Sequence, residues 1–369
     1  MVKLDPRKSE NVHQLGGIRT GTLDSPGAGG GQPVRVAFVD TGSGLRFTVA
    51  LDRGGDIVDA SYNQFGLAYL TANGLLPPSP AYTVGNEWLA GWAGGLVTTC
   101  GPHYIGGARL EDGVQTSLHG RYSQQFATVE TLRNPDPHRG GLDMKIGLIV
   151  RDARVFGPSF EIRRTIRCTL GVPEITIEDE VTNRGDTRVA HHWLYHCNLG
   201  YPLLDRGARF IYRGPAEYWV IPPPAGEDIV QPLSAAAMNR LKRVPDPLPE
   251  HAGFVERGLI VEPPADRTGI AHIGLINPAL KLGIEFSYPA KALPRFANWQ
   301  HFGPYGCYAS ALEPFSGSLL GSARDRHPLA QPALEPGESR HYRLQFRVLA
   351  SAAELRKLAR HDGPVTPAR

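Results

Sequence analysis

Hydrophobic and polar residues alternate with a period of two along most regular parts of this chain. Successive side chains of a β-strand point to opposite faces, so this alternation predicts strands with one buried face. Nine β-branched or aromatic runs bounded by Gly, Pro, Asn or Asp show it, at 34–39, 45–51, 142–151, 160–170, 174–183, 188–196, 269–277, 282–288 and 338–348. Short polar turns join them, which predicts an all-β fold, a large two-layer antiparallel β-sandwich.

Helical periodicity is nearly confined to two segments. Residues 351–361 carry leucines on one face among charged residues and precede Gly363-Pro364, which predicts a short C-terminal helix. Residues 233–241 predict a second short helix inside a Pro-rich excursion at 213–268, for which a functional loop and a plain surface insertion stay open. Without repeats or a linker, we predict one domain over 1–369 with a core at about 35–350.

Composition and charge narrow the class of protein. The 369 residues include 43 Gly and 32 Pro, which favours many turns, and a net charge of +3 without a basic run argues against nucleic acid and membrane partners. No run of about 18 apolar residues and no signal-like apolar segment occur, so we expect a cytoplasmic protein. The four cysteines are widely spaced without a CxxC pair, which predicts reduced buried thiols.

The densest group of polar and aromatic residues lies at 191–202. On one strand, His192, Leu194, His196 and Asn198 would share a face that is unusually polar for a sandwich. His192 and His196 would lie about 13 Å apart, too far for one metal ion, so this pair predicts no metal site. A hydrogen-bonded core histidine, a ligand-binding histidine and a metal ligand with distant partners stay open.

Two further clusters carry groups suited to sugars. His119 and Arg121 would share a strand face about 6.6 Å apart, with Gly120 between them allowing close approach of a ligand. A bulged strand with a surface arginine is the alternative. Trp299 and Gln300 precede Glu313 in Leu312-Glu313-Pro314, and aromatic faces beside amide and carboxylate groups suit sugar C–H faces and hydroxyls.

These pieces, in this order, resemble the aldose 1-epimerase (galactose mutarotase-like) superfamily, and within it the bacterial branch known as domain of unknown function 4432. The shared features span about residues 35–350 and are Arg53-Gly54-Gly55-Asp56-Ile57, the Gly-Gly-Leu-Val-Thr-Thr-Cys-Gly run at 94–101, Leu118-His119-Gly120-Arg121, the run at 195–205 and Leu312-Glu313-Pro314. The resemblance implies a mutarotase-like sandwich in which His119 binds substrate, His196 is the catalytic histidine and Glu313 the catalytic base.

Glutamate and histidine suit the implied chemistry. Opening a cyclic hemiacetal requires one group to take the proton of the anomeric hydroxyl and another to protonate the ring oxygen, without a cofactor. We therefore expect His196 and Glu313 on opposite sides of a sugar-sized hollow. The family's sugar-binding aspartate has only Asp205 and Asp266 as candidates, and Arg53 and Arg121 are candidates to replace its absent Asn-Arg pair.

Three functions follow as hypotheses, each with a small-molecule carbohydrate as partner and a monomer or homodimer as assembly. The first is acid–base interconversion at the anomeric centre of a sugar or sugar derivative. The second is a lyase or isomerase acting on an oxidised (keto) sugar or glycoside, in which His119, His192 and His196 surround a proton-transfer site or a divalent metal. The third is a non-catalytic carbohydrate-binding module, because fold does not determine function.

Overall fold

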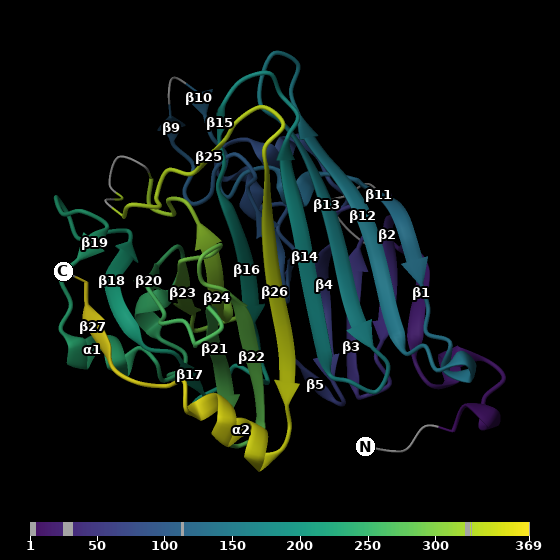
Figure 1. Cartoon of the computed structure of the whole chain (residues 1–369). Coiled ribbons are helices and arrows are strands. Elements are labelled where there is room, and N and C mark those ends of the chain that lie inside the picture. The colour runs from purple at the N-terminus through teal and green to yellow at the C-terminus, as the bar shows by residue number, and fades with distance from the viewer. Residues whose placement is uncertain (1–4, 25–31, 112–113, 322–324, 326, 369) are drawn as a thin grey trace.

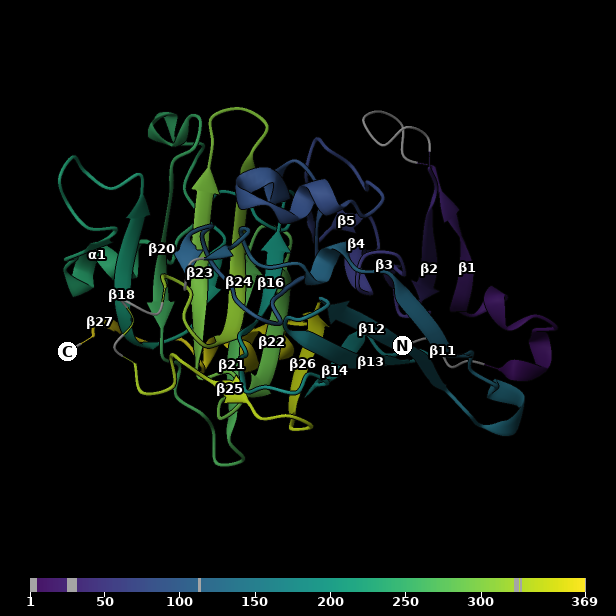
Figure 2. The ribbon, with the colours of Figure 1, turned by 90° about the horizontal axis from the view of Figure 1, so that it is seen from above.

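Two layers of antiparallel strands make up the computed structural model, which describes residues 5–24, 32–111, 114–321, 325 and 327–368. One layer is an eight-stranded sheet, termed the long sheet. The other layer contains the sheet that carries His196, termed the site sheet, and a five-stranded N-terminal sheet beside it (Figures 1 and 2). Both face the long sheet across one hydrophobic core.

Each of the three sheets is built mainly from neighbouring antiparallel strands, named in their spatial order. The N-terminal sheet contains β1 (Gly17–Leu23), β2 (Val34–Asp40), β3 (Leu45–Ala50), β4 (Asp56–Tyr62) and β5 (Phe65–Gly66). The long sheet contains β11 (Ala127–Arg133), β12 (Asp143–Ala153), β13 (Ser159–Thr169), β14 (Glu174–Asn183), β26 (Ser339–Leu349), β22 (Leu282–Pro289), β21 (Ile270–Asn277) and β17 (Arg209–Ile211). The site sheet contains β19 (Val230–Gln231), β18 (Gly214–Ile221), β20 (Glu256–Val261), β23 (Arg295–Phe302), β24 (Tyr308–Ser316), β16 (Trp193–Leu199) and β8 (Thr98–Cys100), with β27 (Val365–Pro367) paired parallel to β18.

Short pairs and helices complete the described chain. The pairs are β6 (Tyr69–Leu70) with β7 (Gly94–Gly95), β9 (Leu110–Glu111) with β10 (Val114–Gln115), and β15 (Val189–Ala190) with β25 (Ala333–Leu334). The α-helices are α1 (Ala235–Arg240) and α2 (Ala352–Ala359), so both predicted helices are confirmed. The 3₁₀ turns are Pro6–Lys8, Val12–Gln14, Pro80–Thr83, Gly85–Leu89, Tyr122–Gln124, Pro137–Arg139 and Pro249–His251.

Eight of the nine predicted strands are confirmed within two residues at each end. The run at 188–196 is the exception, because β15 ends at Ala190 and β16 begins at Trp193, which leaves His191 and His192 between strands. The His191 ring contacts the Pro102 carbonyl at 2.8 Å and the Tyr342 hydroxyl at 2.8 Å, so it is a hydrogen-bonded core histidine. Strands β23 and β24 escaped prediction because nearly all their residues are buried on both faces, so polarity does not alternate.

The four cysteines are free, and three of them are buried, as predicted. Within the described ranges, no helix has the length and apolar character needed to cross a bilayer. The single domain over 1–369 stays a prediction.

A fully buried arginine joins the two layers. Arg164 on β13 donates through Nε and one terminal nitrogen to both carboxylate oxygens of Asp179 on β14, each at 2.8 Å. The same guanidinium reaches Thr99 Oγ1 on β8 at 2.9 Å and Asp56 Oδ1 on β4 at 3.3 Å. Asp179 also accepts a hydrogen bond of 2.6 Å from the Tyr195 hydroxyl on β16. This network fixes strands of all three sheets relative to one another.

We expect Arg164→Ala to lower the free energy of unfolding by about 3–5 kcal/mol, because it leaves buried carboxylates without their partner. Chemical denaturation measures the change. Arg163→Ala is the matched control: Arg163 is the neighbouring residue on β13, but it pairs with Glu130 at the exposed surface at 3.2 Å, and its loss should cost below about 1 kcal/mol. Equal losses for the two variants would contradict the assigned role of Arg164.

Candidate active site

Side-chain alternation along β16 determines which of its side chains point away from the main core. Tyr195 and Cys197 point between the sheets, where the Tyr195 hydroxyl binds Asp179. His196 therefore points to the opposite face of the site sheet, together with Leu194, which packs in a second cluster outside the main core. The predicted polar face of this segment is thus correct for His196, whereas His192 precedes the strand.

Cross-strand pairing brings His196 and Glu313 together. On β24, Phe315 lies opposite Leu194 and Leu312 lies opposite Cys197, which places Glu313 beside His196. His196 Nε2 and Glu313 Oε1 are 3.3 Å apart, and the two residues are 4% and 2% exposed. The expectation that they face each other across a sugar-sized hollow is therefore wrong for this structure, because the two groups are in direct contact.

Aromatic rings cover this pair. The ring of His196 lies 5.4 Å from Trp92, 5.7 Å from Trp299 and 5.3 Å from His119, measured between ring centroids. Trp88, from the 3₁₀ turn Gly85–Leu89, stacks on Trp92 at 5.3 Å. Trp88 and Trp92 are buried, whereas His119 and Trp299 are half-buried, so solvent reaches the cover on their side.

A tight turn places His119 in this cover. His119 has φ of +56° and Gly120 has φ of +79°, so the chain reverses here and does not form the predicted strand. A side chain at 120 would lie 2.6 Å from the Gly101 carbonyl oxygen, which explains the glycine. The backbone N–H of His119 donates to the Gly106 carbonyl at 2.9 Å, which holds the loop. The turn directs His119 and Arg121 to different places, so the prediction that they share a face is wrong.

Burial sets the protonation state of His196 and Glu313, termed the central pair. It raises the pKa of Glu313 well above its usual range, and the nearby charge of Glu256 acts in the same direction. It lowers the pKa of His196 to about 4, and burial beside His196 lowers the pKa of His119 well below its ordinary value. At neutral pH the pair is therefore an uncharged imidazole against a protonated carboxyl group.

Polar groups adjoin the exposed side of the cover. Trp299 Nε1 donates to Glu256 Oε2 at 2.5 Å, and burial raises the pKa of that carboxyl. The Tyr69 hydroxyl donates to Cys307 Sγ at 3.1 Å. Trp88, Trp92 and Glu256 were not predicted from the sequence. The four-residue spacing of the two tryptophans in a loop was an available signal for the first two.

Three predicted substrate residues lie in supporting positions. Arg53 is buried and donates to the backbone carbonyls of Ser123, Leu76 and Gly91, at 2.5 to 2.9 Å, which holds the loop next to Trp92. Asn198 Nδ2 donates to the Gly95 and His196 carbonyls at 3.0 and 3.1 Å. Gln300 Nε2 donates to the Leu241 carbonyl at 2.7 Å. The Asn198 and Gln300 side chains are both buried, and we interpret all three residues as supports of the site.

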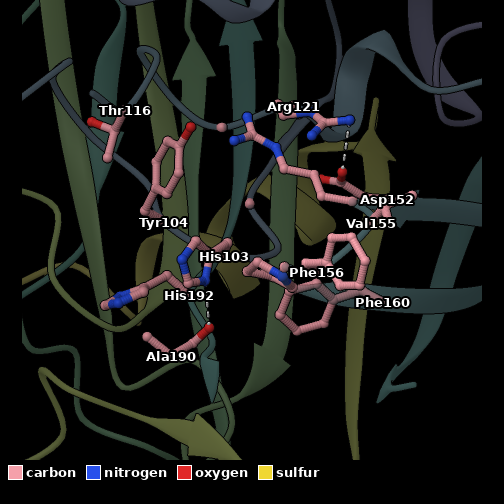
Figure 3. Close-up of a pocket in the computed structure, with 15 residues that line it drawn as sticks. His103, Tyr104, Thr116, Arg121, Asp152, Val155, Phe156, Phe160, Ala190 and His192 are labelled. Carbon is pink, nitrogen blue, oxygen red and sulfur yellow. Dashed lines mark hydrogen bonds and ion pairs between the residues drawn. The ribbon is translucent and has the colours of Figure 1, made fainter. Parts of the chain in front are cut away.

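Two other predicted residues line a neighbouring pocket of about 450 Å³ whose lining includes neither His196 nor Glu313 (Figure 3). In it, Arg121 forms an ion pair with Asp152 at 3.2 Å. His192 Nδ1 accepts a hydrogen bond of 3.1 Å from the backbone N–H of Ser318. His103 and Phe160 also face this pocket. Arg121 and His192 thus line a cavity to which His196 and Glu313 do not contribute.

The two candidates for the sugar-binding aspartate, Asp205 and Asp266, lie outside the site. Asp205 is exposed and accepts a hydrogen bond from the N–H of Arg206, and Asp266 contacts Thr268 and His272 beside the long sheet. In the part of the chain that the structure describes, His119, His192 and His196 do not gather into a group of three metal ligands. The arrangement required by the metal-assisted hypothesis is therefore absent from those residues.

Comparisons with known proteins identify the fold. The family described as domain of unknown function (DUF4432) matches residues 31–348. A candidate aldose 1-epimerase from Klebsiella pneumoniae has a TM-score of 0.81 at 18% identity over 97% of this chain and 93% of that chain. No curated protein sequence matches.

More distant structures show the same architecture. A galactose mutarotase-like protein from Clostridium acetobutylicum has a TM-score of 0.61 at 10% identity, covering 90% of this chain and 98% of that chain. A galactose 1-epimerase from Lactobacillus acidophilus has a TM-score of 0.56 at 12% identity, covering 90% and 99%. The predicted mutarotase-like sandwich is confirmed.

We expect the His196 ring to stay uncharged from pH 8 down to about pH 5, because its pKa is lowered from 6.5 to about 4. The unfolded chain takes up this proton first as the pH falls through 6.5, so the contribution of His196 to stability decreases between pH 6.5 and about 4. NMR titration of histidine-labelled protein, with assignment by His196→Gln, measures the ring. A midpoint near its ordinary value would show that the ring is not desolvated.

Proposed function

This chain belongs to the DUF4432 family, and we propose that it is an isomerase of the aldose 1-epimerase type that interconverts the anomers of a sugar or sugar derivative. The observation that carries the proposal is the direct contact of His196 with Glu313 at a site where burial keeps both groups uncharged. A group poised to accept a proton beside one poised to donate a proton is what reversible opening of a hemiacetal requires.

His196 and Glu313 together supply and accept the protons that each step of the reaction requires. In ring opening, the imidazole of His196 takes the proton of the anomeric hydroxyl while the carboxyl group of Glu313 gives its proton to the ring oxygen. After rotation about the C1–C2 bond, closure returns each proton in the reverse direction, and the opposite anomer forms. In this resting protonation, His196 is the base and Glu313 the acid, the reverse of the roles that the family resemblance implies. The ionised form of the pair has the same number of protons and carries the other assignment.

The aromatic cover gives the site affinity for a sugar and excludes water. The C–H faces of a pyranose pack on indole rings, and Trp92 and Trp299 flank His196. The sugar would enter on the half-buried side, next to His119 and Trp299, and would separate His196 from Glu313 as it binds. Arg53 would hold the loop that carries Trp88 and Trp92 in place while His196 and Glu313 separate, because its three hydrogen bonds end on backbone carbonyls.

We expect Glu313→Gln and His196→Gln each to lower kcat/KM for anomerisation by about 10²–10⁴-fold, because each removes one of the two proton-transfer groups. Polarimetry and exchange NMR on freshly dissolved aldoses and their keto and acid derivatives measure the rate. Glu335→Gln and His341→Gln change exposed residues of the same types and serve as matched controls with unchanged rates.

Wild-type protein that accelerates none of these anomerisations would overturn the proposal. Retained sugar binding by both variants, without turnover by the wild type, would instead indicate a binding module. Turnover of a keto-sugar glycoside with cleavage of its glycosidic bond would indicate the lyase hypothesis.

A further inference from the structure

We propose that His272, Glu285 and His361 form a binding site for a divalent transition-metal ion of the Zn²⁺ class. The site lies where α2 packs on β21 and β22, at the yellow helix in Figure 1, and it is independent of the proposed catalytic pair. Each of the three residues offers one ligand atom, and these atoms lie within 4.8 Å of one another. Two imidazoles and one carboxylate are a ligand set that Zn²⁺ accepts, with a fourth position left for water.

Strand pairing places two of the ligands on one face. On β21, His272 lies opposite Ser287 of β22, and Gly274 lies opposite Glu285. His272 and Glu285 are therefore diagonal neighbours on the outer face of the long sheet. His272 Nδ1 and Glu285 Oε1 are 2.9 Å apart, so the two groups meet directly.

Close packing of α2 places the third ligand. A side chain at Gly274 would lie 3.0 Å from Leu358 Cδ2, and one at Gly283 would lie 2.8 Å from Leu355 Cδ2. These two glycines let the apolar face of α2 lie against the sheet. His361, in the turn that follows α2, then stacks on His272 with 4.4 Å between ring centroids. Two imidazoles and a carboxylate thus converge from three elements.

A second carboxylate supports His272 from the other side. His272 Nε2 lies 3.3 Å from Asp266 Oδ2, while Asp266 itself accepts hydrogen bonds from the N–H groups of Thr268 and Ile270. A metal-bound histidine commonly donates its other N–H to a carboxylate held in this way. The ion would replace the proton between His272 Nδ1 and Glu285, releasing it to solvent, and the Asp266 contact would orient the ring.

The arginine beside Glu285 is paired with other carboxylates. Arg347 lies opposite Glu285 on the neighbouring strand β26. Its guanidinium pairs with Glu174 at 3.4 Å and with Glu354 at 3.2 Å. Both imidazoles and Glu285 are half-buried, so an ion can reach them from solvent.

Calorimetric titration of the chelator-treated full chain with Zn²⁺ and Co²⁺ tests the site. We expect one equivalent to bind, with the visible absorption of four- or five-coordinate Co²⁺. His361→Gln and His272→Gln should each weaken binding at least tenfold. Asp266→Asn should weaken it by about 10–100-fold, because the Asp266 carboxylate orients the His272 ring. His341→Gln is the matched control, because His341 is an exposed histidine of the same sheet, and it should leave binding unchanged.

Circular dichroism and thermal melting without metal show whether each variant is folded, and anomalous diffraction from a Zn²⁺-soaked crystal locates the ion independently of the variants. Absence of binding by the wild type would overturn the proposal. So would equal affinity of the wild type and the folded His272→Gln/His361→Gln double variant, or an ion located elsewhere on the chain.

Discussion

The buried contact of Arg164 with Asp179 is the constraint on which the rest of this structure depends. Asp179 accepts hydrogen bonds from the Tyr195 hydroxyl and from the Arg164 guanidinium. The bond from Tyr195 fixes which face of β16 points inward, because it cannot form in another register of the strand. A shift of one residue would turn Tyr195 outward and bury His196 in the core. The network thus determines which side chain of β16 meets Glu313.

The chemistry of the central pair follows from its surroundings more than from its residue types. An exposed glutamate would be ionised at neutral pH and an exposed histidine would titrate at about pH 6.5, but tryptophan rings on one side and the sheet on the other favour the uncharged forms of both. Arg53 contributes indirectly, because it fixes the backbone that carries Trp92. Support from buried residues of this kind allows a site made of short motifs to keep one geometry.

Prediction from the sequence succeeded where apolar and polar residues alternate regularly along a strand, and where a short motif is distinctive by itself. Six of the eight strands of the long sheet were predicted, whereas β11 and β17 were missed. His119 and Glu313, both singled out from the sequence, lie beside His196. Prediction failed where both faces of a strand are buried, as in β23 and β24, and where a residue's partners are backbone atoms distant in sequence, as for Arg53. Residue type alone could not show that Gln300 supports the sheet, whereas the neighbouring Trp299 covers His196.

The position of β26 between β14 and β22 has a consequence for biosynthesis. Strands β11 to β14 are adjacent in sequence and can pair as soon as they leave the ribosome, but β14 keeps an open edge until residues 339–349 have been made. Such an edge is a template for pairing with other chains. Nascent chains of this protein therefore pass through a stage in which β14 has an unpaired edge, and pairing of that edge with another chain competes with folding.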